Sequence, residues 1–110
     1  SREIVYETTA TAPPEELHRF FLACREDGFQ PARRRLRELL DRFGLAGTDL
    51  VNQLHRGLGD VPFLTEGQKL LVTQTMAEAD FRMVEGGGEA LQLDAMTARL
   101  CTLLSPEMKS

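Results

Sequence analysis

The sequence predicts an all-α protein, a bundle-like domain of five helices preceded by a short extended segment. Apolar residues recur at the i, i+3, i+4 and i+7 spacing of an amphipathic helix in several separate stretches. Glycine, proline and capping residues separate these stretches. A chain of 110 residues, 42% apolar and 27% charged, has the length and composition of one soluble domain with a single core.

Residues 3–11 are rich in β-formers and lead to Ala12, Pro13 and Pro14. A lone strand has no partner here, so this segment is either disordered or the last piece of a preceding domain. Proline is tolerated at the start of a helix, because its missing N–H would be unpaired there anyway. The first helix is therefore predicted over residues 14–26. Its apolar stripe consists of Leu17, Phe20, Phe21 and Cys24.

The second helix is predicted over residues 29–43. Either Asp27 or Gly28 caps it, Pro31 falls in the first turn, and Gly44 ends it. Its apolar stripe consists of Ala32, Leu36, Leu39, Leu40 and Phe43.

This second helix also carries five arginines: Arg33, Arg34, Arg35, Arg37 and Arg42. They could form a face that contacts nucleic-acid phosphates or an acidic partner. They could instead form a solvated or subunit-facing surface, in which Arg34 pairs with Glu38 and Arg37 pairs with Asp41. No aromatic residue lies among them to stack on bases, which favours the second interpretation.

The third helix is predicted over residues 48–56, with Thr48 as its N-cap and with Gly57 and Gly59 ending it early. Its inward residues are Leu50, Val51, Leu54 and Leu58. The next helix starts at a Thr-x-x-Gln capping box formed by Thr65 and Gln68.

Residues 68–85 are the centre of the predicted bundle, because their apolar residues fall on two opposite faces of a helix that turns about 100° per residue. One face carries Leu70, Ala77, Phe81 and Val84. The opposite face carries Val72, Met76, Ala79 and Met83. A surface helix needs only one apolar stripe, so both faces of this helix are expected to be covered. The cover is either sister helices of the same domain or another subunit.

Gly86, Gly87 and Gly88 are predicted to form a flexible turn, since a phosphate-binding loop would need a lysine and a preceding strand. The last helix is predicted over residues 89–104. Its main stripe consists of Leu93, Met96, Leu100, Leu103 and Leu104. A second face of mostly small residues, Leu91, Ala95 and Ala98, suggests contacts on two sides.

The sequence contains no recognisable catalytic motif, so we expect no enzyme activity from this chain. The net charge of −4 argues against a dedicated nucleic-acid binder. No apolar run has the length of a membrane span or of a signal-peptide core. Cys24 and Cys101 are interpreted as small buried hydrophobes, with a disulfide or metal site as the alternative. His18 and His55 are isolated and are interpreted as structural residues.

Four segments, in order, resemble segments of the replication factor C small subunits. Residues 27–36, DGFQPARRRL, are similar to GDFxxARxxL of that family. Residues 45–56, LAGTDLVNQLHR, resemble GL(S/A)GxDhhxQhHR, where h is apolar. Residues 78–86, EADFRMVEG, resemble GExDaRhxEG, where a is aromatic, and residues 92–98, QLDAMTA, resemble QLEALLA. The spacing agrees over residues 13–105, and the archaeal type of small subunit is indicated.

The resemblance implies the C-terminal collar domain of a clamp-loader subunit. Residues 1–12 would be the end of a lid domain and its linker, residues 13–105 the helical oligomerisation domain, and residues 106–110 a tail. In that family the collar holds five subunits in a ring, while AAA+ modules bind ATP and magnesium and place a sliding clamp on primer–template DNA. The motifs of those modules match nothing here, so no cofactor is expected in this chain.

The partners implied by the resemblance are sister small subunits, a large subunit, the sliding clamp and the DNA. A homo-oligomer in the cytoplasm, associated with the nucleoid and not with a membrane, is expected. The candidate interface residues are Val72, Met76, Ala79 and Met83 on the central helix and Leu91, Ala95 and Ala98 on the last one. Two other classes stay open: a DNA-binding module that uses the arginine face, and an adaptor whose groove binds a partner's helix.

Overall fold

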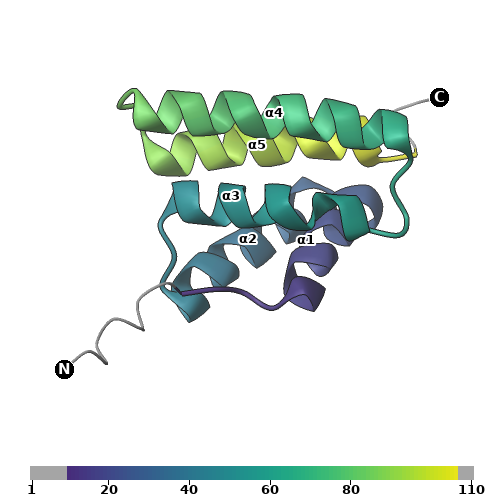
Figure 1. Ribbon diagram of the computed structural model, residues 1–110, viewed down its shortest axis with the longest axis horizontal. Helices are drawn as coiled ribbons and strands as arrows, with labels where there is room; N and C mark the ends of the chain where they lie inside the picture. The colour runs from purple at the N-terminus through teal and green to yellow at the C-terminus, as the bar shows by residue number, and fades with distance from the viewer. Residues whose placement is uncertain (1–9, 107–110) are drawn as a thin grey trace.

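The computed structural model describes residues 10–106, which form five α-helices and one 3₁₀ turn arranged in two layers (Figure 1). The elements are α1 (Pro14–Glu26), α2 (Phe29–Phe43), α3 (Gly47–Gly57), η2 (Leu58–Asp60), α4 (Glu66–Val84) and α5 (Glu89–Leu104). Helices α4 and α5 lie side by side as one layer, and α1, α2 and α3 form the other. The predicted all-α fold with five helices is confirmed. Most of the predicted extended segment, residues 3–9, lies outside the described residues.

The bounds of α1, α2 and α5 agree with the predicted ranges because local signals fix both ends of these helices. Pro14 is the first residue of α1. Gly28, and not Asp27, is the N-cap of α2; its φ of 95° is a conformation that favours glycine. Gly44 ends α2 in the left-handed conformation, as a C-terminal glycine commonly does.

The predicted N-cap of α3 is wrong. The helix begins at Gly47, its N-cap is Ala46, and no side chain caps it. Gly47 packs closely against the other layer: a Cβ at this position would lie 2.8 Å from Cγ of Glu89 and 3.0 Å from Sδ of Met83. Gly47 is the first residue of the helix, one residue earlier than the sequence predicted. The predicted early end is confirmed, since α3 stops at Gly57.

Both ends of α4 are set by short-range contacts. The predicted capping box is present, with the Thr65 hydroxyl accepting from the Gln68 N–H at 3.0 Å and the Gln68 side chain accepting from the Thr65 N–H at 2.9 Å. The turn to α5 has Gly86 at a φ of 105°. A Cβ on Gly87 would lie 2.9 Å from the carbonyl oxygen of Arg82. The turn is therefore tight: Gly86 supplies the positive φ, and Gly87 the close packing.

One hydrophobic core lies between the two layers. The inward stripes predicted for α1 and α3 are fully buried, and those of α2 and α5 are buried or half-buried. The largest side chains with almost no exposure include Phe20, Phe21, Leu39, Leu50, Leu54, Val72, Met76, Leu100 and Leu104. This core draws on all five described helices, α1 to α5.

Candidate subunit interface

The structure separates the two apolar faces of α4. Val72, Met76 and Ala79 are 0%, 1% and 5% exposed and belong to the core, and Met83 is half-buried against it. Helices α3 and α5 pack against α4 on this side. The first three residues therefore have almost no free surface to offer another subunit; Ala79 keeps a small exposed part where it lines the groove between α4 and α5. Their assignment as interface candidates is corrected: the stripe is covered by sister helices of the same domain.

The opposite face of α4 is open to solvent. Leu70, Phe81 and Val84 are 66%, 62% and 70% exposed, and Ala77 is exposed beside them. Their spacing of seven, four and three residues is that of a coiled-coil seam, in which each apolar residue meets a second helix. The stripe is about 21 Å long at 1.5 Å per residue. Large apolar side chains in a row usually mark an interaction surface.

The predicted second face of α5 is also accessible. Leu91 is 69% exposed, and Ala95 and Ala98 are exposed on the same side of the helix. These three residues remain interface candidates. Their small or aliphatic side chains would allow a partner's backbone to come close without burying a charge.

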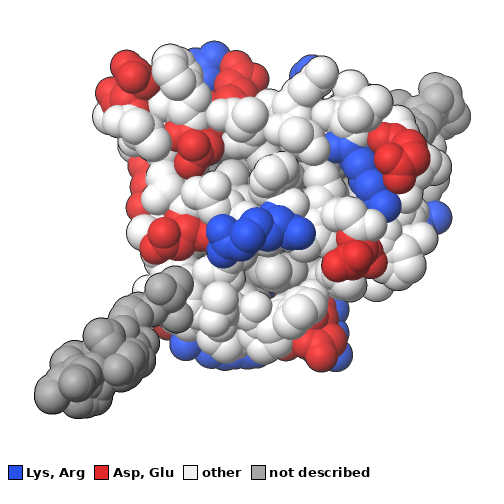
Figure 2. All heavy atoms as spheres, in the orientation of Figure 1, with Lys and Arg blue, Asp and Glu red and all other residues white. Residues whose placement is uncertain are grey.

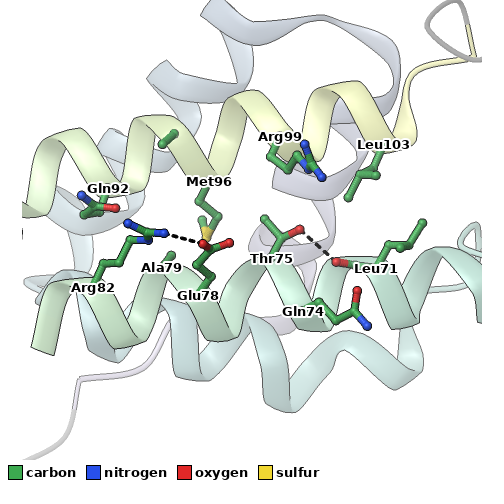
Figure 3. A pocket seen from close by; sticks show the side chains of 11 residues that line it. Leu71, Gln74, Thr75, Glu78, Ala79, Arg82, Gln92, Met96, Arg99 and Leu103 are labelled. Atoms are coloured by element: carbon green, nitrogen blue, oxygen red, sulfur yellow. Dashed lines mark hydrogen bonds and ion pairs between the residues drawn. The ribbon is translucent and has the colours of Figure 1, made fainter. Parts of the chain in front are cut away.

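A groove of about 480 Å³ lies between α4 and α5 (Figure 3). Ala95 of α5 is among the residues that line it. Its apolar part is formed by Leu71, Ala79, Met96 and Leu103. The polar part includes an ion pair between Glu78 and Arg82 at 2.6 Å, and the side chain of Arg99. The groove therefore offers both an apolar floor and charges of either sign at its edge.

The arginines of α2 pair with carboxylates on other helices. The carboxylate of Asp94 on α5 forms ion pairs with Arg33 at 3.1 Å and with Arg37 at 3.0 Å. Glu16 of α1 lies 3.2 Å from Arg42 and 3.9 Å from Arg35. These contacts tie α2 to its two neighbours. The predicted i, i+4 pairs along α2 are not formed in the described part of the chain.

These pairs leave little free positive charge for DNA. Of the five arginines, Arg34 is the one that makes no ion pair within residues 10–106, and it is exposed. On the one face that Figure 2 shows, red and blue side chains are scattered among uncharged ones without a continuous basic patch. A phosphate-binding face usually needs several uncommitted cations close together. The geometry thus favours a structural role for the arginine face.

The two cysteines lie together where α1 packs on α5. Both are free thiols, Cys24 buried and Cys101 half-buried. A hydrogen bond with Cys101, together with burial, raises the pKa of the Cys24 thiol well above its usual value. The same hydrogen bond lowers the pKa of Cys101. The interpretation as small core residues is confirmed for Cys24 and holds in part for Cys101.

This asymmetry predicts different reactivities of the two thiols. We expect an alkylating reagent at neutral pH to modify Cys101 first, because the thiolate is the nucleophile and its lowered pKa and partial exposure favour attack. Cys24 should react only after denaturation. Mass spectrometry of a time course measures the order of modification. Equal rates for both thiols in the folded protein would contradict the arrangement.

The remaining polar residues of the described chain form no metal-ligand cluster. Within residues 10–106, no three His, Cys, Asp or Glu side chains come together to hold a metal ion. His18 is half-buried on α1 and His55 is exposed on α3. None of the described helices is long and apolar enough to cross a membrane.

Three residues matter structurally that the sequence did not single out for their contacts. Asp94 and Glu16 hold the arginines of α2, and Gln53 of α3 is 5% exposed and bonds to the segment before α1. Gln53 could have been found as a polar residue on the inward side of α3, next to Leu54. The partners of the arginines are distant in sequence and left no local signal.

Comparisons with known proteins agree with this helical domain. The family described as "Replication factor C C-terminal domain" matches residues 12–99. Similar proteins include the replication factor C small subunits of Methanocella arvoryzae (34% identical over 87% of this chain), Methanosarcina acetivorans (37% over 89%) and Natronomonas pharaonis (38% over 89%). The matches cover 30%, 31% and 30% of these relatives, so the chain spans just under a third of their length.

The fold is thus that of a helical C-terminal domain found in longer proteins. The family match covers most of the described helices, so the chain belongs to the replication factor C C-terminal domain family. The resemblance found in four short sequence segments is confirmed.

Proposed function

We propose that this chain is the oligomerisation domain of a clamp-loader small subunit and that the outward face of α4 contacts a neighbouring subunit. The observation that carries the proposal is the exposed stripe of Leu70, Ala77, Phe81 and Val84, which the described residues 10–106 leave uncovered. The domain has a complete core without these side chains. Burial of these side chains against a neighbouring subunit would therefore stabilise the association, and the fold of the single domain does not depend on it.

A ring of like subunits is built from heterologous contacts, in which two different surfaces of each subunit meet. The α4 stripe offers one such surface. The α5 face of Leu91, Ala95 and Ala98, with the adjoining groove, offers a second one. Arg99 at the groove could pair with Glu85, which is exposed at the end of the stripe. These two surfaces are the ones we assign to the ring.

The remainder of the longer parent would carry the ATP-dependent work. We propose that an AAA+ module there binds ATP and magnesium, and that the parent meets a large subunit, the sliding clamp and primer–template DNA. This part of the proposal rests on family membership alone. No cofactor is proposed for the helices described here.

The test is the double variant Phe81→Asp, Val84→Asp. We expect it to associate at least about tenfold more weakly than the wild type, because two carboxylates would have to be buried in an apolar contact. The helical content and the unfolding midpoint should stay close to those of the wild type, since both side chains are exposed. Light scattering over a range of concentrations, on this chain and on the longer parent, measures association.

Leu22→Asp is the matched control. Leu22 is a half-exposed leucine on α1, in the other layer. This variant should associate like the wild type. Unchanged association of the double variant would refute the assignment of the α4 face. Loss of a different protein from the purified parent complex, with the ring intact, would favour the helix-binding adaptor.

A further inference from the structure

The segment before α1 is packed against the domain. Ala12 is 7% exposed and forms part of the core. Residues 10–12 contain no helix or strand, so ordinary secondary structure does not hold them in place. In Figure 1 this segment enters from the side of the N-terminus and passes below α3 on its way to α1.

A buried side chain of α3 holds the backbone of this segment. The Gln53 Oε1 accepts a hydrogen bond from the Ala12 N–H at 2.9 Å. The Gln53 Nε2 donates to the carbonyl oxygen of Ala10 at 3.0 Å. The two bonds lie on either side of Thr11. The side-chain amide of Gln53 therefore binds the backbone at two points, and its own buried polar atoms are hydrogen-bonded.

The next two residues restrict the backbone further. Pro13 has a φ of −63° and a ψ of 146°, and Pro14 is the first residue of α1. A proline ring fixes φ, and it also keeps the preceding residue in the extended region. The path from Ala12 to α1 therefore has few alternatives. The burial of Ala12, the two hydrogen bonds and the prolines act at successive positions.

We propose that Gln53 is a positioning residue that fixes the direction in which the chain enters the helical domain. Residues 10–12 would then move together with α1 and α3 and would not act as a free hinge. This inference goes beyond the proposed subunit contact and is independent of it.

Amide exchange and ¹⁵N relaxation of this chain test the proposal. In the wild type, the amide of Ala12 should be as ordered as helical amides, with an order parameter of about 0.85. Gln53→Met removes both hydrogen bonds while keeping a similar volume. Its Ala12 amide should exchange about tenfold faster or more, and the order parameters of residues 10–12 should fall below about 0.6.

Gln53→Glu separates the two bonds. Its carboxylate can still accept from Ala12 but cannot donate to Ala10, so Ala12 should stay protected while Ala10 and Thr11 gain mobility. A purely structural Gln53 would instead loosen α3 and the core together. A mobile Ala12 amide in the wild type, or unchanged order in Gln53→Met, would overturn the proposal. Association should not change in either variant, so this result is independent of the test on α4.

Discussion

Replacing Val72 by Asp is expected to unfold the domain. Val72 is fully buried on α4, among side chains of the shared core. Aspartate there loses the packing of the valine and places a carboxylate in the apolar core, which costs at least about 4 kcal/mol. A domain of this size has only about 5–15 kcal/mol of stability in total. Circular dichroism with urea titration should show a greatly lowered midpoint or no folded baseline.

Val84→Asp provides a control on the same helix and with the same residue change. Val84 is 70% exposed, so the free energy of unfolding of this variant should lie within about 0.5 kcal/mol of the wild-type value. Asparagine has a shape similar to that of aspartate but no charge. The stability of Val72→Asn at neutral pH should therefore lie between the stabilities of Val72→Asp and Val84→Asp. Equal stability of the two aspartate variants would show that the two faces of α4 have been assigned the wrong way round.

The sequence predicted which segments are helices because their ends carry local signals. Thr65 with Gln68, and glycine at position 44, set a helix end without help from distant residues. At α3 the predicted start is off by one residue, because the helix begins at Gly47. Gly47 packs against Glu89, which follows it by more than forty residues, so no local signal in the sequence marks this contact.

The two stripes of α4 show what periodicity cannot decide. Both faces repeat with the helical period, and the outer one carries the larger side chains, including Leu70 and Phe81. The inner one is built from Val72, Met76 and Ala79. The inner face is buried because α3 and α5 both pack against α4. Hydrophobicity alone would have ranked the two faces as equals, and the neighbours of α4 settled which is core.

The arginine face shows the same limit for charges. Neighbours at i, i+4 are visible in a sequence, and the sequence predicted pairs along α2. The structure uses Asp94 and Glu16 on other helices, so that Arg37 serves the packing of α2 on α5. Partly exposed pairs of this kind contribute about 1 kcal/mol or less each. Their main consequence is that the paired arginine side chains are not available to bind a partner.

Phe20→Ala is expected to have the second largest effect. Phe20 is completely buried on α1, and its ring centroid lies 5.6 Å from that of Phe21 at a tilt of 51°. Truncation removes the transfer free energy of the ring and leaves a cavity between the two layers, which together cost about 3–5 kcal/mol. For a domain of this size, the unfolding temperature should fall by more than about 10 °C. Calorimetry or thermal circular dichroism measures the change.

Phe81→Ala is the matched control for Phe20→Ala, because it makes the same truncation on an exposed face. Both phenylalanines lie in apolar stripes of the sequence, but Phe81 is 62% exposed. Its truncation should leave the unfolding temperature within about 2 °C of the wild type and should weaken association. If Phe81→Ala also lost several kcal/mol of stability while the protein was monomeric, the outer stripe would be part of the fold. If Phe81→Ala lowered stability only at protein concentrations at which copies associate, Phe81 would stabilise the contact between subunits and not the fold.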